Sequence, residues 1–458
     1  MAESSLSQAK LGQLIESGHV DTVMMVFTDM QGRLQGKRLH SKYFLDQAQA
    51  RGIEGCNYLL AVDVDMNTVS GYEISSWQRG YGDFRIRPDM NTLRAAPWYP
   101  GTAMVQCDLV WHDGTPVVQS PRQVLRAQVE EARDLGCEVL AATELEFIVF
   151  RDTYQEAYDA QYRGLTGSTR YNVDYSILGT SSDEPLMRDI RNSMYNAGLS
   201  VEYSKGECNR GQHEIAFLYD RALITADNHV VFKTAAKELA ARHDQSLTFM
   251  AKYDEREGNS CHIHMSLRGT DGSLIFAEDP NSLPEFSDGR SPLFRSFVAG
   301  VLATMRDFTL LYAPNINSYK RFAKGSFAPT GIAWGEDNRS CALRVVGQGP
   351  SLRVENRVPG GDANPYMALS AMLAGGLFGI RGGLPLEAPF EGNAYAADLA
   401  RVPSTLQEAR DVFARSELAK DAFGEDVVAH YVNAADVELE AFNSSVTDWE
   451  RERGFERL

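Results

Sequence analysis

The sequence predicts a mixed α and β protein, with a small strand-rich segment followed by one large α/β or α+β domain. Three observations predict this class. Short strand-like pieces separated by turns fill most of the first 111 residues. From residue 120 onward, apolar strands alternate with long helical stretches. The chain has 458 residues, 43% of them hydrophobic, which is enough for a large buried core.

The small segment begins with a predicted amphipathic helix at residues 5–17. The stretch DTVMMVFTD, the turn QGR and the stretch LQGKRLH then predict a β-hairpin over residues 21–40. The stretch TAMVQCDLVW predicts a strand at 102–111. We therefore expect a small N-terminal domain over 1–112 and a larger domain over 113–458.

The large domain opens with a predicted helix at Ser120-Pro121. Serine is a favourable N-cap, proline suits the first helical position, and Gly136 follows the expected end. Beyond it we expect strands at 138–150 and 260–267, and helices at 186–197, 222–243, 293–312 and 364–380. The tail over 426–451 is predicted to be one further helix.

Composition narrows the possible partners. The net charge of -17 argues against a nucleic-acid partner, because phosphate backbones attract clustered lysine and arginine. The six cysteines are scattered without a CxxC pair, which predicts reduced thiols and a cytoplasmic location. The N-terminal sequence lacks the apolar core of a signal peptide, and no run approaches the ~20 apolar residues of a membrane helix. We expect no membrane partner.

Two strand-like segments place pairs of chemical groups on one face. In TELEFIVF (143–150), Glu144 and Glu146 share a face because side chains alternate along a strand. In GNSCHIHMSL (258–267), His262 and His264 share a face for the same reason. Taken alone, an exposed strand or two half-buried structural histidines explain these pairs at least as well as a binding site.

Two further segments carry charge. GECNRGQHEI (206–215) places Glu207 and Glu214 on either side of a glycine-containing stretch, which alone predicts only a surface turn. LRVENRVPGG (352–361) places Arg353, Glu355 and Arg357 on one strand face. An exposed salt-bridged strand is one interpretation. The flanking apolar residues favour burial, and buried charges must be paired or coordinated.

Together these segments predict a phosphoryl-transfer site. Five glutamates and one histidine are enough to hold two divalent cations, and Mg²⁺ and Mn²⁺ prefer oxygen ligands. Arginine holds phosphate and carboxylate groups through paired hydrogen bonds. Divalent cations beside an arginine cluster are typical of phosphoryl transfer.

In this order, the segments resemble the glutamine synthetase family. The resemblance covers nearly the whole chain and includes NSYKRF (317–322), GSFAP (325–329), DNRSCALRV (337–345) and RVENRVPGGDANPY (353–366). It implies an α+β fold with a small N-terminal β-grasp domain and a large catalytic domain, built on a curved antiparallel sheet with surrounding helices. It also implies a homo-oligomer, a dodecamer of two stacked hexameric rings with active sites between neighbouring subunits.

The resemblance also implies roles for individual residues. The ligands of one metal would be Glu146, Glu207 and Glu214, and those of the other Glu144, His262 and Glu355. The substrate glutamate would lie among Gly258, His262, Arg321 and Arg357. The ATP-binding residues would be His264, Ser266, Arg339, Arg344, Arg353 and Glu207. The catalytic residues would be Arg339, Arg321 and Arg357.

The activity implied by the resemblance is an ATP-dependent ligation. ATP phosphorylates the γ-carboxylate of glutamate in the presence of two or more Mg²⁺ or Mn²⁺ ions, and an amine then displaces phosphate to give an amide.

Two departures from the family pattern concern the amine. Ammonia-using members carry a glutamate in the flap after the KR motif, where GSFAP has Phe327. Their FDGSS-like segment has no counterpart within 61–84, where Asp63 and Asp65 are the nearest candidates. Because an amine with a carbon tail gains from an apolar wall, we expect an organic amine as nucleophile.

Glu257 replaces a family asparagine before Gly258, and we expect it to pair with the α-ammonium of glutamate or with the incoming amine.

The chain, including EGCNYLLAVD and KYDEREGNSCHIH, most resembles the γ-glutamylethanolamide synthetase branch of the family. Ethanolamine is therefore the favoured amine. The alternatives are an ammonia-using glutamine synthetase, a γ-glutamylpolyamine synthetase, a non-catalytic relative and a guanidino kinase. Tyr395 in GNAYAADL is expected to be a structural surface residue.

Overall fold

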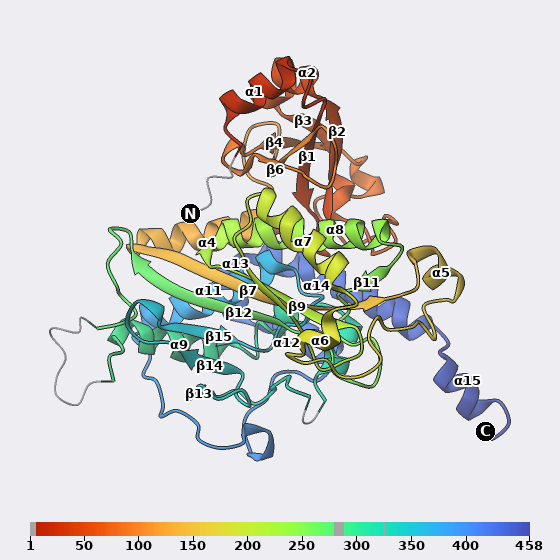
Figure 1. Ribbon diagram of the computed structural model, residues 1–458. Coiled ribbons are helices and arrows are strands. Elements are labelled where there is room, and N and C mark those ends of the chain that lie inside the picture. Colours follow the sequence, from red (N-terminus) through yellow and green to blue (C-terminus); the bar gives the residue numbers. More distant parts are fainter. Residues whose placement is uncertain (1–5, 279–287, 324–325) are drawn as a thin grey trace.

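The computed structural model describes residues 6–278, 288–323 and 326–458. Figure 1 shows a small sheet at the N-terminal end, standing on the helices that cover a larger sheet. Within the described ranges, no helix combines the length and apolar character that crossing a bilayer requires.

The small sheet is six-stranded, in the order β2–β1–β6–β4–β3 with β5 paired to β6. Its strands are β1 (Thr22–Thr28), β2 (Leu34–His40), β3 (Ile53–Cys56), β4 (Asp83–Pro88), β5 (Arg94–Ala95) and β6 (Thr102–Val110). The β1–β2 pair is antiparallel, as the hairpin prediction requires, and β1 also pairs in parallel with β6. Helix α1 (Gln8–Glu16) buries Leu11 and Ile15, so the predicted N-terminal helix is confirmed.

The large sheet is nine-stranded, in the order β13–β14–β15–β12–β7–β9–β8, with β10 and β11 also paired to β7. All its strand pairs are antiparallel except β13–β14. Its strands are β7 (Cys137–Phe150), β8 (Val201–Gly206), β9 (Gln212–Phe217), β10 (Asp220–Arg221), β11 (Ser246–Thr248), β12 (Cys261–Gly269), β13 (Trp334–Glu336), β14 (Leu343–Val346) and β15 (Arg353–Asn356). The α+β fold class with a largely antiparallel sheet is confirmed.

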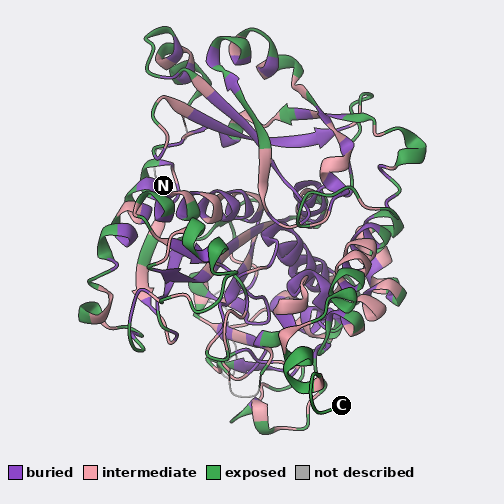
Figure 2. Cartoon of the chain, turned by 90° about the vertical axis from the view of Figure 1, so that its right-hand side faces the viewer, coloured by how far each residue is buried: buried purple, intermediate pink, exposed green. Residues whose placement is uncertain are grey.

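The remaining α-helices belong to both parts of the chain, and some of them cover one face of the large sheet. They are α2 (Ser41–Tyr43), α3 (Gln49–Arg51), α4 (Pro121–Asp134), α5 (Tyr154–Asp159), α6 (Ile177–Thr180), α7 (Glu184–Asn196), α8 (Ala222–Arg242), α9 (Pro292–Thr304), α10 (Thr309–Tyr312), α11 (Pro365–Gly382), α12 (Leu406–Arg415), α13 (Glu417–Phe423), α14 (Glu425–Ser444) and α15 (Asp448–Gly454). Helices α4 and α8 pack on β7, and α11 packs on α4, α8 and α9. Figure 2 shows this inner layer as mostly buried.

The two faces of β7 have different neighbours. The hydroxyl of Thr225 in α8 donates to the carbonyl of Ala141 at 2.9 Å, and Thr143 Oγ1 lies 3.1 Å from His229 Nδ1 of the same helix. The odd-numbered side chains of β7 therefore face the helices, since side chains alternate along a strand. The even-numbered side chains, which include Glu144 and Glu146, face away from this layer.

Two predicted helices are each divided in two. The stretch 293–312 forms α9 and α10, because the hydroxyls of Thr304 and Thr309 bond to carbonyls four residues back and compete with the helical pattern. The tail 426–451 forms α14 and α15, because Thr447 and Glu450 build a capping box that starts a new helix. Helix α4 starts at Pro121 as predicted, although the Ser120 side chain makes no capping hydrogen bond.

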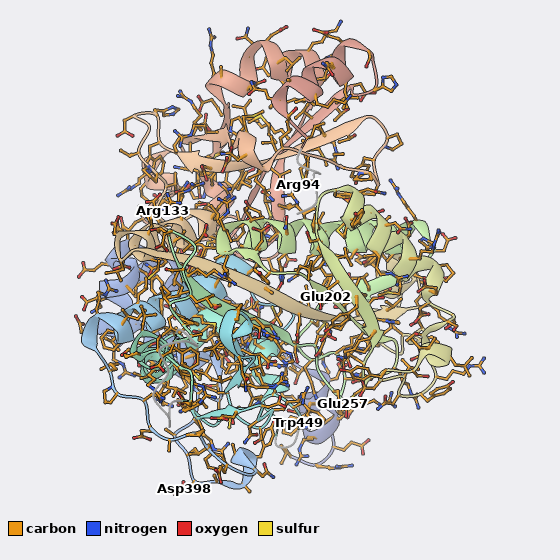
Figure 3. The ribbon with its side chains drawn as sticks, turned by 60° about the vertical axis from the view of Figure 1, so that its left-hand side comes forward. Arg94, Arg133, Glu202, Glu257, Asp398 and Trp449 are labelled. Atoms are coloured by element: carbon orange, nitrogen blue, oxygen red, sulfur yellow. The ribbon has the colours of Figure 1, made fainter. Side chains whose placement is uncertain are left out.

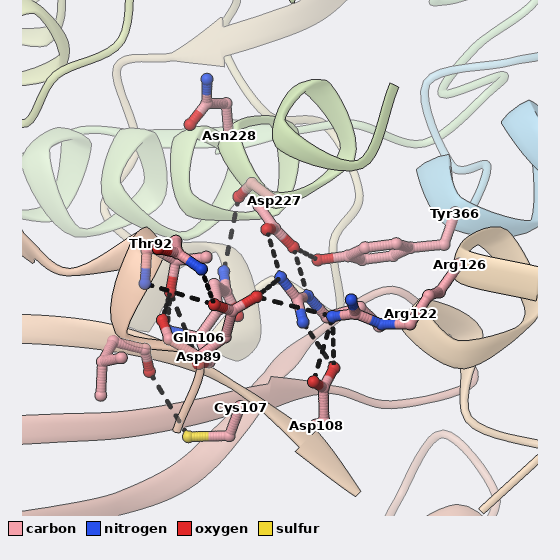
Figure 4. A network of polar contacts seen from close by, with 12 residues as sticks. Asp89, Thr92, Gln106, Cys107, Asp108, Arg122, Arg126, Asp227, Asn228 and Tyr366 are labelled. Atoms are coloured by element: carbon pink, nitrogen blue, oxygen red, sulfur yellow. Dashed lines mark hydrogen bonds and ion pairs between the residues drawn. The ribbon is translucent and has the colours of Figure 1, made fainter. Parts of the chain in front are cut away.

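A buried charge network joins the small sheet to the helix layer (Figure 4). Arg122 of α4 is 2% exposed and contacts Asp89 after β4, Asp108 of β6 and Asp227 of α8, the last at 2.9 Å. Tyr366 of α11 donates to Asp227 Oδ1 at 2.6 Å. One guanidinium thus holds carboxylates from both parts of the chain.

The described strands of the small sheet lie within 22–110, and those of the large sheet within 137–356. We propose that the expected division into 1–112 and 113–458 marks the domain boundary. The Arg122 network would then fix the two domains to each other.

The network gives a stability prediction. The change Asp227→Ala leaves the buried Arg122 guanidinium short of a partner, and we expect it to lower the free energy of unfolding by about 3–5 kcal/mol. Chemical denaturation at matched protein concentration measures the change. The control Asp436→Ala removes a half-exposed partner of Arg410 and should lower it by no more than about 1 kcal/mol. Equal losses in the two variants would contradict the role given to the network.

Candidate active site

Strand register brings the predicted acidic and imidazole residues into directly opposed pairs. Glu146 of β7 lies opposite Glu214 of β9, and Glu144 lies opposite His262 of β12. On the other side of β12, His264 lies opposite Glu355 of β15. Directly opposed side chains on one sheet face are close neighbours. Residues more than 200 positions apart in the sequence therefore share one small area.

These side chains form two groups that offer ligand atoms to a cation. Glu144, His262 and Glu355 place one oxygen or nitrogen atom each within 4.8 Å of one another. Glu146 and Glu214 form a similar group, again with His262. His262 Nδ1 lies 3.3 Å from Glu144 Oε2 and 3.5 Å from Glu355 Oε1. The first group has the three residues that the sequence analysis assigned to one metal.

The second group differs from the expected set, because Glu207 lies in a separate group with Asp174 and Cys208. The Glu207 side chain contacts the ammonium of Lys205, whose Nζ also lies 3.9 Å from Glu214 Oε1. Lys205 was not among the residues predicted from the sequence. The alternation of side chains along a strand could have indicated it, because residues two positions apart, such as Lys205 and Glu207, point to the same face.

Two buried carboxylates, Glu146 and Glu214, lie near other negative charges and have little positive charge beside them. Burial and the nearby Glu207 charge raise the pKa of Glu146 to about 7. Burial and the Glu144 charge raise the pKa of Glu214 to about 8. For Glu355, burial would raise the pKa, but the His262 and Arg357 charges outweigh it and lower the pKa to about 2. The Glu146–Glu214 side of the site therefore favours an added cation.

The residues fit a hard divalent cation. The donors are mainly carboxylate oxygens, which Mg²⁺ and Mn²⁺ prefer. His262 Nε2 is buried and has no hydrogen-bond partner among the described residues. Buried polar atoms are normally satisfied, so an unpartnered imidazole nitrogen beside carboxylates is consistent with a metal ligand.

Two buried arginines lie beside the acidic groups. Arg321 is 1% exposed and donates to Val358 O and to Ser260 Oγ, each at 2.8 Å. Arg357 contacts Glu355. Gly258 lies against Arg321, and a Cβ at this glycine would be 2.2 Å from the carbonyl oxygen of Ala251. The tight approach of these segments therefore requires glycine.

A cavity of about 240 Å³ opens next to the cation-binding groups. Among its lining residues are Leu140, Ala142, Glu144, His264, Ser266 and Arg353. Ser266 donates to Leu352 O at 2.9 Å, and Arg353 Nε donates to His264 Nδ1 at 3.2 Å. Three of the residues expected to contact ATP, namely His264, Ser266 and Arg353, thus line one cavity.

The other two arginines expected at ATP differ in position. Arg344 of β14 lies beside the acidic groups and bonds to Glu355 Oε2 at 2.8 Å and to Asp337 Oδ1 at 2.6 Å. Arg339 is exposed on the loop between β13 and β14. The structure therefore brings Arg344 into the cluster and leaves Arg339 at its surface side.

Of the residues expected around the amine, Phe327 and Glu257 lie on loops between β11 and β13, whereas Asp63 and Asp65 lie between β3 and β4. Phe327 is 57% exposed with a φ of 54°, and Gly325 of the same GSFAP motif lies outside the described residues. Glu257 is half-buried, on the loop after β11 (Figure 3), and its carbonyl accepts a hydrogen bond from Asn209 at 2.8 Å. Asp63 accepts hydrogen bonds from Asp65 and Asn67 within its own loop.

Tyr395 corrects one expectation. The side chain is half-buried, but its hydroxyl is buried without a hydrogen-bond partner among the described residues, so the expectation of a surface residue holds for only part of the side chain. Burial raises the pKa of Tyr395, and the charges of Arg357 and Arg321 act in the opposite direction, which places the hydroxyl near both arginines. No local sequence pattern indicates this, because the contact joins a late loop to the sheet.

Comparison with known proteins supports the same assignment. The family described as the glutamine synthetase catalytic domain matches residues 118–454. Gamma-glutamylethanolamide synthetase GlnA4 of Streptomyces coelicolor is 60% identical over 453 residues, which cover 99% of this chain and 96% of that protein. Glutamate–isopropylamine ligase of a Pseudomonas species is 38% identical and covers 99% of each chain.

The fold also has a close match among solved structures. The GmaS/ADP complex superposes with a TM-score of 0.84 at 24% identity, covering 97% of this chain and 99% of that one. The catalytic-domain match and the relatives that span nearly the whole sequence lead to one conclusion: the chain belongs to the glutamine synthetase family.

Proposed function

We propose that this protein is an ATP-dependent glutamate–amine ligase that makes γ-glutamylethanolamide. The observation that carries the proposal is the 60% identity to gamma-glutamylethanolamide synthetase GlnA4 along nearly the full length of both chains. The 38% identity to glutamate–isopropylamine ligase supports an organic amine as the nucleophile.

The reaction needs two steps. The γ-carboxylate of glutamate is a poor electrophile, because its leaving group would be oxide. A carboxylate oxygen therefore attacks the γ-phosphorus of ATP, ADP leaves, and γ-glutamyl phosphate forms. The neutral amine then attacks the acyl carbon, phosphate leaves and the amine loses a proton. The product is an amide, with ADP and phosphate released.

The residues described above have proposed roles in these steps. The cation ligands are Glu144, His262 and Glu355 for one metal, and Glu146, Glu207 and Glu214 for the other. Arg321, Arg357 and Gly258 hold the substrate glutamate, with His262 and Glu257 beside it. His264, Ser266, Arg344 and Arg353 hold ATP, with Glu207 and Arg339 completing the set. Arg339, Arg321 and Arg357 stabilise negative charge that develops on the transferring groups. When bound, divalent cations neutralise the phosphate oxygens.

The flap residue supports the choice of amine. Ammonium is small and strongly hydrated, and a carboxylate in the flap favours it. Phe327 offers no carboxylate, whereas its ring can contact the carbon tail of ethanolamine. A polyamine carries a second positive charge at its far end, which additional carboxylates would stabilise. The flap instead has Phe327 where ammonia-using members of the family have a glutamate. Ammonium and polyamines are therefore the secondary candidates.

We also propose that the chain assembles as a dodecamer of two stacked hexamers in the cytoplasm. Helix α15 extends away from the body of the molecule (Figure 1), and Trp449 on it and Phe455 directly after it are 65% and 89% exposed. An arm with large exposed apolar groups favours contact with another copy. All six cysteines are free, which is consistent with a reducing compartment.

An amine panel tests the proposed function. We expect phosphate release with glutamate, ATP and ethanolamine to exceed that with ammonium, putrescine, spermidine, ethylamine or isopropylamine, and mass spectrometry to identify γ-glutamylethanolamide. Strong turnover with ammonium and none with ethanolamine would overturn the choice of amine. Absence of cation-dependent ATP turnover with every amine would overturn the ligase itself.

Phe327→Glu tests the flap. The added carboxylate should raise the ratio of kcat/KM for ammonium to kcat/KM for ethanolamine roughly tenfold, the scale of one charge-assisted contact. The matched control is Phe327→Gln, which has the same shape without the charge. If the two variants have the same ratio, the carboxylate has no role at this position.

The raised carboxyl pKa values predict how pH affects cation binding. Because the pKa values of Glu146 and Glu214 are raised by folding, the cation-free protein should lose stability as pH rises from about 5 to about 8. Cations need ionised ligands, so Mn²⁺ should raise the unfolding midpoint more at about pH 8.5 than at about pH 6. Thermal unfolding with and without Mn²⁺ at both pH values measures this.

The control pair for that measurement is Glu214→Gln and Glu130→Gln, since Glu130 is exposed on α4. Glu214→Gln should stabilise the cation-free protein at about pH 8.5 and weaken its response to Mn²⁺. Glu130→Gln should match the parent. An undiminished Mn²⁺ response in Glu214→Gln would remove this glutamate from the cation site.

A further inference from the structure

The sheet face that carries the cation-binding groups continues into a second cavity. Beyond Glu146, the next side chains on the same face of β7 are Ile148 and Phe150, and both line a cavity of about 370 Å³. This volume lies in the range of small-molecule sites. Its lining also includes Leu165, Asn209, Asp254 and four arginines.

This arginine cavity has an unusual charge. Four arginines line it in a chain whose net charge is -17. Arg151 donates twice to Ser168 O, but the guanidinium groups of Arg170, Arg210 and Arg256 have no hydrogen bond or ion pair to another described residue. Asp254 is the one acid in the lining, and its Oδ1 accepts from Asn209 and from the Arg256 amide. The cavity therefore contains unpaired positive charge that an anion could neutralise.

The arginine cavity shares a wall with the candidate glutamate site. Asn209 is 1% exposed, and its amide donates to Asp254 at 3.0 Å and to the carbonyl of Glu257 at 2.8 Å. Its backbone N–H donates to the side chain of Gln212. Gln212 in turn donates to Gly258 O at 2.9 Å and to Glu146 Oε2 at 3.2 Å. A short chain of buried hydrogen bonds thus connects the two sites.

We propose that the arginine cavity binds a small dianion, next to the loop that carries Glu257 and Gly258. Three unpaired guanidinium groups supply more positive charge than a monoanion neutralises, and each can form paired hydrogen bonds to a carboxylate or phosphate. The apolar floor of Ile148, Phe150 and Leu165 favours a dicarboxylate with a carbon chain over inorganic phosphate. This inference does not depend on which amine the enzyme uses.

Isothermal titration of the whole protein tests the proposal, with glutarate, inorganic phosphate and acetate as probes at equal ionic strength. The variant is Arg170→Gln/Arg210→Gln/Arg256→Gln, in which exposed, unpaired side chains are replaced and the fold should be retained. The control is Arg133→Gln, because Arg133 is also exposed and lies far from Glu257 (Figure 3). Thermal unfolding without probe checks that all variants are folded.

We expect glutarate to bind more tightly than phosphate, and acetate to bind weakly. The triple variant should bind glutarate at least roughly tenfold more weakly, and Arg133→Gln should bind it as the parent does. Equal glutarate affinity in the triple variant and the parent would place the probe in the glutamate site instead and overturn the proposal. Tighter binding of phosphate would overturn the preference for a dicarboxylate.

Hydrogen–deuterium exchange tests the location independently. Glutarate should slow exchange over residues 253–259 in the parent, because the dianion would fix the wall formed by Asn209 and Asp254. The triple variant should show no such protection. Binding by the parent without protection of this segment would contradict the site.

Discussion

The repulsion among buried carboxylates is the constraint on which the rest of this structure depends. Glu146 and Glu214 face each other across β7 and β9, and burial raises the pKa of both. Lys205 supplies one positive charge to this side of the site, while Arg344 and Arg357 supply two to Glu355. Positive and negative charges are thus balanced around Glu355, whereas negative charge is in excess around Glu146. A bound cation would neutralise most charge near Glu146.

The fold must hold these carboxylates close together against their mutual repulsion, because carboxylates that moved apart would bind a cation weakly. The odd-numbered face of β7 is held by α8 through Thr143 and Ala141. Gly379 of α11 lets this helix approach α9 closely, since a Cβ there would lie 2.0 Å from the carbonyl oxygen of Ser296. The Arg122 network then fixes the small sheet to the same helices. On its even-numbered face, β7 leads from the ATP-side cavity, past the cation-binding groups, to the arginine cavity.

Local patterns in the sequence predicted much of this arrangement. Strand alternation placed Glu144 with Glu146 and His262 with His264, and the structure puts each pair on one face. Alternation cannot give the register between distant strands, so the grouping of Glu207 with Asp174 rather than with Glu214 was not predicted. The buried hydroxyl of Tyr395 was missed for the same reason, because tertiary packing alone brings it to the arginines. The helix breaks at 305–308 and 445–447 depend on threonine hydroxyls, which the apolar pattern does not report.

The most direct test of the cation site is a crystal structure with ADP and Mn²⁺, in which anomalous scattering locates the ions. The account predicts one peak among Glu144, His262 and Glu355, and a second within coordination distance of Glu146 and Glu214. Peaks elsewhere, with these five side chains bound to no ion, would contradict the assignment of the site.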